Sequence, residues 1–209
     1  NAQNPFFFRA ISGLYPPGSS IKPVIALAAL EEGVINESKA IFSSGSISIP
    51  NPYYPDKVSI FYDWKAHGWV NLRRALAVSS NVYFYSIGGG FGDVGGLGVT
   101  RIKKYLKMFG LGAVTGIDLP GEKAGFIPDP KWKAREFTDK NWRVGDTYNL
   151  SIGQGWLEVT PLQMALIVSA ISQNGKMARP FIVKEIKDPE RGIVYQATPE
   201  TMLDNSKKI

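Results

Sequence analysis

The stretch "YPPGSSIKP" at residues 15–23 constrains the start of this chain more than any other segment. Two prolines and a glycine impose a sharp turn, and the apolar pattern that follows predicts a helix over residues 20–32, ended by a glycine. Pro23 disfavours helical geometry at Lys22, but a proline costs least in the first helical turn, where N–H groups lack partners in any case. We therefore expect a helix with an irregular first turn and Ser19 at its beginning.

Ser19 and Lys22 are three residues apart, a spacing that puts both side chains on one face of a helix. A serine hydroxyl becomes a good nucleophile when a base removes its proton, and lysine is such a base only when neutral. Burial lowers the pKa of a lysine, and the positive end of a helix favours an alkoxide over an ammonium. The pattern therefore allows a nucleophile with its base. In the structural alternative, Ser19 or Ser20 caps the helix and Lys22 is a solvated side chain.

A second polar segment, Ser79-Ser80-Asn81, separates the helical patterns "LRRALAV" and "VYFYSIG", the first of which is capped by Asn71. Taken alone, this segment is most simply an inter-helix turn in which Asn81 caps the second helix. Ser-x-x-Lys followed by Ser-x-Asn is, however, the paired signature of serine acyl-transfer enzymes that act on penicillin-like and D-alanyl substrates. The two segments together favour the functional interpretation.

The rest of the chain alternates helical patterns with turns. Residues 42–70, rich in Ser, Pro, Gly and aromatic side chains, predict an irregular segment with short strands. Thr100 is expected to cap a helix that runs through Phe109. Thr160 with Pro161 opens the helix "PLQMALIVSAIS", which is apolar on nearly every side and is therefore expected to be buried. "FIVKEI" and "GIVYQA", joined by "KDPERG", predict a β-hairpin.

Composition excludes several classes of protein. The 209 residues contain no cysteine and one histidine, so disulfides, thiolate metal sites and histidine-rich metal sites are impossible. The net charge of +6 is spread along the chain without a nucleic-acid-reading motif, which argues against nucleic-acid binding. The longest apolar run, "VIALAAL", is far shorter than the ~20 residues that span a bilayer.

Other candidate sites have less support. A Ser-His-Asp triad would need His67, but "DWKAHGW" is better explained as a loop packed by its tryptophans. "GGGFGD" lacks the Gly-Lys-Ser/Thr of a phosphate-binding loop. Asp118 and Glu122 could be imagined as a glycosidase pair, although "DLPGE" is more simply a turn. The aromatic segment 53–69 could bind sugars, but we expect it to form local core instead.

Four motifs resemble one family. "GLYPPGSSIKP", "ALAVSSNVYFY", "TGIDLPGE" and "SIGQGWLEVTPLQMA" are similar, in the same order, to the transpeptidase domain of class B penicillin-binding proteins. "YPPGS", "DWKAHG" and "GDTYNLSIGQG" resemble the cell-elongation (rod-shape) type rather than the division type. The resemblance implies that Ser19 is the acylated nucleophile and Lys22 its base. It also implies that Ser79 is the proton shuttle towards the leaving group, and that Asn81 holds the Lys22 ammonium and the substrate amide.

One departure concerns the family's third motif, Lys-Ser/Thr-Gly on a strand lining the pocket. It is absent from these residues, because "KAG" at 123–125 belongs to a loop. We therefore expect residues 1–209 to be a partial penicillin-binding transpeptidase domain, which lacks that strand and the strands upstream. The expected fold is α+β, of the serine transpeptidase/β-lactamase type: mainly its helical portion, with part of the central antiparallel sheet missing. On its own, the chain is expected to be inactive.

The resemblance also implies an activity, partners and a location. It implies a peptidoglycan D-alanyl-D-alanine transpeptidase that cross-links stem peptides through a serine acyl-enzyme and is the target of penicillins, without metal or organic cofactor. Its partners would be stem peptides, β-lactam antibiotics, and wall-polymerase and elongation-complex membrane proteins, but not nucleic acid. The catalytic domain would lie on the outer (periplasmic or extracellular) face of the bacterial cytoplasmic membrane. The alternatives are a β-lactam sensor domain that is acylated once and signals, and a β-lactamase, for which no deacylating base can be located.

Overall fold

The computed structural model describes residues 5–51, 54 and 56–207. These residues form two compact units. The first, called here the motif-bearing unit, comprises Pro17–Tyr105 and Pro128–Trp156. The second unit comprises the described residues of Asn1–Pro16, Leu106–Ile127 and Leu157–Ile209. Both polar segments singled out in the sequence therefore belong to the motif-bearing unit.

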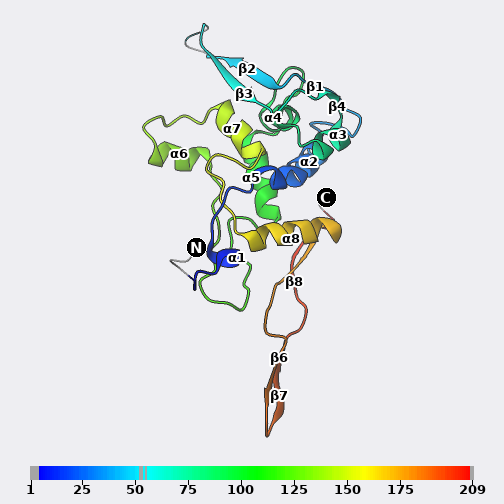
Figure 1. Cartoon of the computed structure of the whole chain (residues 1–209), viewed down its shortest axis with the longest axis vertical. Coiled ribbons are helices and arrows are strands. Elements are labelled where there is room, and N and C mark those ends of the chain that lie inside the picture. Colours follow the sequence, from blue (N-terminus) through cyan, green and yellow to red (C-terminus); the bar gives the residue numbers. More distant parts are fainter. Residues whose placement is uncertain (1–4, 52–53, 55, 208–209) are drawn as a thin grey trace. The chain divides into compact units, whose positions relative to one another are not determined.

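Helices form the framework of the motif-bearing unit (Figure 1). They are η1 (Gly18–Ile21), α2 (Lys22–Glu31), α3 (Leu72–Ala77), α4 (Asn81–Gly89), most of α5 (Gly98–Met108), α6 (Pro130–Glu136) and α7 (Val144–Ser151). The strands of this unit are β1 (Ile41–Ser43), β2 (Ser46–Pro50), β3 (Val58–Tyr62) and β4 (Gly68–Val70). The helix predicted over residues 20–32 is thus confirmed as α2, and its irregular first turn is the 3₁₀ helix η1.

Helix α4 forms the centre of this unit's core and packs against α2 and α7. Every residue from Val82 to Gly88 is buried. Two glycines allow α7 to approach closely: a Cβ on Gly88 would lie 2.3 Å from the Cβ of Ser151, and a Cβ on Gly89 would lie 2.4 Å from the Tyr148 ring. The C-terminal end of α4 is consequently packed closely against α7.

The segment over residues 42–70 contains short strands, as predicted, in two antiparallel ribbons. β1 pairs with β4 in the register Ile41↔Val70, and β2 pairs with β3 from Ser46↔Tyr62 to Pro50↔Val58. Each ribbon has only two strands, so its backbone hydrogen bonds are satisfied on one side of each strand. Contacts with the helices, such as β1 and β3 with α4, are therefore needed to stabilise them.

The expectation that aromatic side chains of residues 53–69 form local core is wrong for most of them. Tyr54, Tyr62, Trp64 and Trp69 are 61%, 67%, 61% and 72% exposed. Phe61, by contrast, packs edge-on against Tyr148 with 4.9 Å between ring centroids. Successive side chains of a strand point to opposite faces, and only one face of such a ribbon packs on the helices. Tyr53 lies outside the described residues.

The second unit contains α1 (Arg9–Ser12), α8 (Pro161–Ser172), β5 (Lys176–Ala178), β6 (Glu185–Asp188), β7 (Gly192–Gln196) and β8 (Thr201–Asp204). β5 pairs antiparallel with β8, and β6 with β7. The predicted hairpin is confirmed, although β6 begins at Glu185 and residues 181–183 are not part of it. The predicted cap is also confirmed: the N–H of Gln163 donates to Thr160 Oγ1 at 3.2 Å, and the N–H of Thr160 donates to Gln163 Oε1 at 2.9 Å.

Two further helix predictions need correction. Helix α8 is not buried on all sides: Ile167 is buried, whereas Val168 is 62% exposed, because α8 contacts α1 and β5 of its unit along one stripe. Helix α5 begins at Gly98, so Thr100 lies inside the helix and does not cap it. Gly98 has φ +73°, a left-handed conformation that glycine adopts without steric cost at the point where the chain enters the helix.

Candidate active site

Ser19 stands at the beginning of η1, where the chain turns sharply. Gly18 has φ +57°, which glycine adopts without steric cost, and the Ser20 hydroxyl donates to Pro17 O at 2.6 Å. In a 3₁₀ helix, residues i and i+3 eclipse one another, so Ser19 and Lys22 lie one turn apart on the same side. Ser19 is exposed. The turn therefore presents a serine hydroxyl to solvent directly above a lysine.

The turn that carries Ser19 is hydrogen-bonded to the turn that follows α7. The N–H of Gly18 donates to the carbonyl oxygen of Gly153 at 2.8 Å. The two backbones are so close that a Cβ on Gly153 would lie 2.2 Å from Gly18 O, and Gly153 has φ +71°. A glycine meets both demands, so the "SIGQG" segment has a direct structural role in placing Ser19.

The Ser79-Ser80-Asn81 segment turns the chain from α3 into α4. Ser79 has φ +54°, an uncommon left-handed conformation for a residue with a side chain. Ser80, and not Asn81, caps α4, because its side chain accepts from the N–H of Tyr83. Asn81 is the first residue of the helix, and its side chain takes no part in that cap. The capping alternative for Asn81 is therefore wrong.

Lys22 is buried against this segment, with 2% of its surface exposed. Its Nζ donates to Ser79 O at 2.8 Å, to Ser79 Oγ at 3.0 Å and to Asn81 Oδ1 at 2.8 Å. The Phe84 ring lies 5.2 Å from Nζ. Lys22 is thus not a solvated helix residue. Its three N–H donors have three neutral oxygen acceptors, which satisfy the ammonium without neutralising its charge.

Burial lowers the pKa of Lys22 from 10.5 to about 8, and the negative charge of Asp63 opposes this shift. Desolvation disfavours the charged form of a group, whereas a nearby carboxylate favours an ammonium. A substantial fraction of Lys22 is consequently neutral in mildly alkaline solution. The site can therefore supply a base near physiological pH, which a lysine of ordinary pKa cannot do.

Ser79 lies between Lys22 and Ser19. Its hydroxyl donates to Ser19 Oγ at 2.9 Å and accepts from Lys22 Nζ at 3.0 Å. Within the described chain, Lys22 and Ser19 are connected through Ser79 rather than by a direct hydrogen bond. When Lys22 loses a proton, two N–H donors remain for Ser79 O and Asn81 Oδ1, and the lone pair faces Ser79 Oγ. The four residues predicted from the sequence thus form one connected group.

Asp63 is a neighbour of this group that the sequence did not single out. Its side chain is completely buried, and Oδ2 accepts from Ser80 Oγ at 2.8 Å and from the N–H of Val82 at 3.0 Å. Burial alone would raise the pKa of Asp63, but hydrogen bonds from the backbone of Asn81 and Val82, from Ser80 and from Trp64 lower it overall. Asp63 is therefore an ionised carboxylate inside the unit.

The weaker sequence candidates have structural roles. His67 lies beside Trp64, with 4.9 Å between ring centroids, and its Nε2 is 3.7 Å from Asp63 Oδ1. The prediction that tryptophans pack this loop is wrong, because Trp64 and Trp69 are 61% and 72% exposed. Glu122 accepts from the N–H groups of Thr115 and Gly116 at 2.7 and 3.0 Å and closes the predicted "DLPGE" turn. Among the described residues, no group of three or more His, Cys, Asp or Glu could hold a metal ion.

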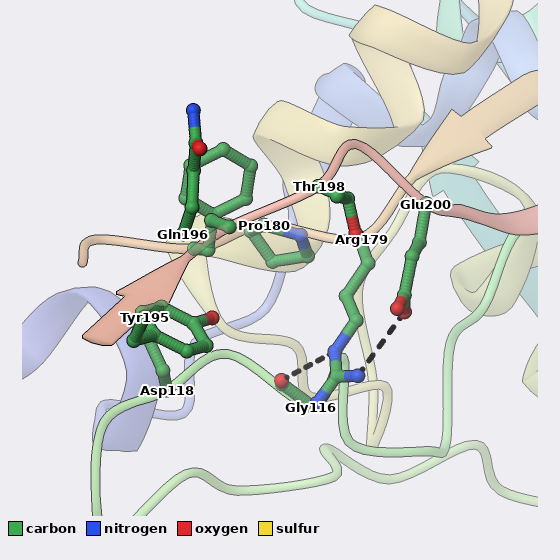
Figure 2. A pocket seen from close by; sticks show the side chains of 10 residues that line it. Gly116, Asp118, Arg179, Pro180, Tyr195, Gln196, Thr198 and Glu200 are labelled. Carbon is green, nitrogen blue, oxygen red and sulfur yellow. Dashed lines mark hydrogen bonds and ion pairs between the residues drawn. The ribbon is translucent and has the colours of Figure 1, made fainter. Parts of the chain in front are cut away.

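Two hollows lie in different units. A hollow of about 420 Å³ adjoins Ser79 in the motif-bearing unit, lined by Trp64, Lys65, Ala66, His67, Arg74, Ala77, Val78 and Ser79. The second, of about 180 Å³, lies in the second unit (Figure 2). There Arg179 Nε donates to Gly116 O at 2.9 Å and Nη1 pairs with Glu200 at 3.2 Å, so its donors hold loops together. Only the first hollow adjoins the predicted residues.

An exposed serine, linked through a second hydroxyl to a buried lysine with a lowered pKa, is the arrangement of a serine–lysine nucleophile. The family model described as "penicillin binding protein transpeptidase domain" matches residues 1–209. The chain belongs to this family.

Named relatives and solved structures agree with this assignment. The peptidoglycan D,D-transpeptidase MrdA of Acinetobacter baumannii is 35% identical over 186 residues, which cover 88% of this chain and 26% of that protein. MrdA of Escherichia coli K12 is 34% identical over 181 residues, 86% of this chain and 27% of that protein. The chain thus spans about a quarter of the length of these curated relatives.

Two solved structures share the fold. One is the complex between the penicillin-binding protein PBP2 and MreC from Helicobacter pylori, with TM-score 0.77 and 36% identity, covering 90% of this chain and 33% of that one. The other is Pseudomonas aeruginosa PBP2 in complex with WCK 5153, with TM-score 0.78 and 31% identity, covering 98% of this chain and 43% of that one. The α+β transpeptidase fold predicted from the sequence is confirmed, as the part of it that these residues contain.

Proposed function

We propose that the protein carrying this chain is a peptidoglycan D-alanyl-D-alanine transpeptidase of the elongation type, with Ser19 as nucleophile, Lys22 as base, Ser79 as proton relay and Asn81 as the side chain that orients Lys22. The observation that supports it most directly is the series of contacts Ser19–Ser79–Lys22, which ends on a buried lysine with a lowered pKa. The names of the relatives support the substrate class.

The acylation step follows from these contacts. Ser19 Oγ attacks the carbonyl carbon of the penultimate D-alanine. Its proton passes to Ser79 Oγ while the proton of Ser79 passes to neutral Lys22, which becomes an ammonium. Collapse of the tetrahedral intermediate breaks the peptide bond, and the ammonium returns its proton through Ser79 to the leaving D-alanine amine. A serine ester and free D-alanine result, so protons and bonds balance.

In the second half of the reaction, an amine of a neighbouring stem peptide attacks the ester carbonyl carbon, and its proton passes through Ser79 to Lys22. The ester bond then breaks, the proton returns through Ser79 to Ser19 Oγ, and the new amide cross-link and free Ser19 result. The backbone N–H of Ser19 would be one donor to the oxyanion. We propose that the other donor, and the cation that holds the substrate carboxylate, belong to the Lys-Ser/Thr-Gly strand that residues 1–209 lack. Without these groups, residues 1–209 by themselves are expected to be inactive. Penicillins would acylate Ser19 and be released slowly.

Partners and location follow from the same proposal. One solved relative is a complex of PBP2 with MreC, and another is a peptidoglycan synthase complex that coordinates polymerisation and crosslinking. We expect this protein to work with elongation-complex membrane proteins and a wall polymerase, on the outer face of the cytoplasmic membrane. None of the helices in the described part of the chain is long and apolar enough to cross a membrane.

Fluorescent penicillin labelling of the full-length protein tests the assignment of Ser19. Peptide mapping should find the label on Ser19, and Ser19→Ala should abolish labelling. Ser20→Ala is the matched control: it removes the neighbouring hydroxyl, which donates to Pro17 O, and should still be labelled. Labelling that survives Ser19→Ala would contradict the assignment.

Turnover separates the proposed enzyme from its alternatives. With a D-Ala-D-Ala peptide and an acceptor amine, the full-length protein should release D-alanine over many cycles and form cross-linked product. Stoichiometric acylation without turnover would instead indicate a sensor that is acylated once. Rapid hydrolysis of penicillin would indicate a β-lactamase.

A further inference from the structure

The mechanism above leaves one buried charge without a role. The carboxylate of Asp63 lies in the loop after β3, and its side chain has no solvent exposure. A buried carboxylate is costly unless hydrogen bonds satisfy it. Here Oδ2 accepts from Ser80 Oγ at 2.8 Å, from the N–H of Val82 at 3.0 Å and from Ser43 Oγ at 3.2 Å, and Oδ1 accepts from the N–H of Trp64 at 2.9 Å. Both carboxylate oxygens of Asp63 thus accept hydrogen bonds.

Two of these donors belong to the segment that presents Ser79 and Asn81. Ser80 lies between the two residues that contact Lys22, and Val82 follows them. Lys22 therefore holds this segment through Ser79 and Asn81, while Asp63 holds it through Ser80 and Val82. The backbone of Asn81 also hydrogen-bonds Asp63, so this short segment is held by two buried charged groups, which restricts its rotation more than either set of contacts alone.

The backbone of Ser79 needs such support. A left-handed φ of +54° at a residue with a side chain costs free energy, and it persists where the surroundings enforce it. The hydroxyl of Ser79 must stay within hydrogen-bond distance of both Ser19 and Lys22 for the relay to work. A displacement of about 1 Å at a reacting group can reduce a rate ~10²-fold.

Asp63 also acts on Lys22 through its charge. In the described chain, the titratable groups that interact with Asp63 are Lys22 of α2, His67 of the same loop and Tyr85 of α4. Burial lowers the pKa of Lys22 and raises that of Tyr85, and the negative charge of Asp63 opposes the first shift and adds to the second. Removal of that charge should consequently let burial lower the pKa of Lys22 further.

We propose that Asp63 is a positioning residue for the acyl-transfer reaction: its buried carboxylate fixes the Ser79-Ser80-Asn81 segment through Ser80 and Val82, so that the Ser79 hydroxyl bridges Ser19 and Lys22. This inference rests on the proposed function. It assigns to "DWKAHGW" a role in the reaction that the sequence did not indicate.

The test measures the rate of penicillin acylation by the full-length protein between pH 6 and 10 for Asp63→Asn, Ser80→Ala and the double variant. Asp63→Asn should slow acylation ~10–10²-fold at the optimum and should move the acid limb of the profile, near pH 8 in the wild type, to lower pH. Ser80→Ala keeps the charge, so it should slow acylation without moving the limb. The double variant should be no slower than Asp63→Asn, because both changes act through one contact.

Ser86→Ala is the matched control. It removes a buried hydroxyl from α4, the helix that Ser80 caps. This hydroxyl donates to Val82 O and does not contact Asp63, so its loss should leave the acylation rate and the acid limb unchanged. Asp63→Asn that acylates within twofold of wild type with an unmoved limb overturns the inference, and so does additive slowing in the double variant. If Asp63→Asn does not fold, a Ser80→Ala rate equal to that of Ser86→Ala overturns it instead. Absence of wild-type labelling at Ser19 would refute the proposed function itself, a distinct outcome.

Discussion

Two lysines are buried among the described residues of the motif-bearing unit, and they differ in the groups that accept their hydrogen bonds. Lys22 and Lys133 are 2% and 5% exposed, and each has an aromatic ring near Nζ, at 5.2 Å and 5.4 Å. Lys133 forms an ion pair with Asp146 Oδ2 at 2.6 Å, which joins α6 to α7. Lys22 is surrounded by a carbonyl, a hydroxyl and an amide oxygen of Ser79 and Asn81.

This difference separates a structural lysine, Lys133, from the proposed base, Lys22. A carboxylate partner favours the ammonium and holds the proton, whereas neutral oxygens hydrogen-bond the ammonium without balancing its charge. The cost of burial then falls on the charged form of Lys22, and its pKa drops to about 8. Burial alone therefore does not distinguish the proposed base from a structural lysine. The distinguishing features are the neutral acceptors around Lys22 and the Ser79 hydroxyl that connects it to Ser19.

The largest effect should come from replacing each lysine by arginine, which stays protonated at working pH. Lys22→Arg should slow acylation of the full-length protein ~10²–10⁴-fold, because a proton-transfer group is lost. Lys133→Arg keeps the charge opposite Asp146 and should acylate at nearly the wild-type rate. The measurement is the rate of fluorescent penicillin labelling. A Lys22→Arg protein within tenfold of wild type, about 1.4 kcal/mol in barrier, would mean that another group is the base.

The next effect is on stability. Asp146→Asn leaves the Lys133 ammonium buried without its carboxylate and should lower the free energy of unfolding by ~3–5 kcal/mol. Asp139→Asn is the matched control: it breaks the exposed ion pair with Arg143, whose side chains are 51% and 48% exposed, and should cost ~0–1 kcal/mol. Denaturant titration compares them. Equal losses would show that the Lys133–Asp146 pair contributes no more than a surface pair.

The smallest effect comes from giving Lys22 the kind of partner that Lys133 has. Asn81→Asp places a carboxylate on Nζ and should raise the pKa of Lys22, so the acid limb of acylation should move upward from about pH 8 by ~1 pH unit. The rate should fall about tenfold at neutral pH and recover in alkaline solution. Asn71→Asp makes the same change at the cap of α3 and should leave the limb in place. An Asn81→Asp protein with the wild-type profile would indicate that the partners of Lys22 do not set its pKa.

The parts of the fold that the sequence predicted well depend on local chemistry. Thr160 with Gln163, and Asn71 before α3, satisfy N–H groups of their own first turns, so their roles are visible within four residues. The proximity of Ser19, Lys22, Ser79 and Asn81 depends on contacts between distant segments, and it was reached by resemblance, because no local pattern brings the two motifs together. Asp129 followed by Pro130 is an equally local signal, a capping side chain before a first-turn proline, and the α6 helix that it begins was not predicted.

What could not be predicted depends on contacts between segments that are far apart in the sequence. Asp63 looked like one polar residue of an irregular loop, and its donors Ser80 and Val82 come from a different part of the chain. The exposure of Trp69 could not be predicted from the aromatic-rich sequence around it, because it depends on which face of the β1–β4 ribbon packs against a helix. Likewise, Val168 of α8 is exposed although its neighbours are apolar.

The hydrogen bond between Gly18 and Gly153 implies an order of events during synthesis of the chain. Ser19 is translated before Gly153, the residue after α7 whose carbonyl oxygen holds the turn of Ser19. A contact between residues so far apart in the sequence forms only when other interactions offset the entropy that the intervening chain loses on loop closure. The turn of the proposed nucleophile should therefore form late in folding, and a nascent chain truncated before Gly153 should carry Ser19 in a turn that is not fixed and does not react with penicillin.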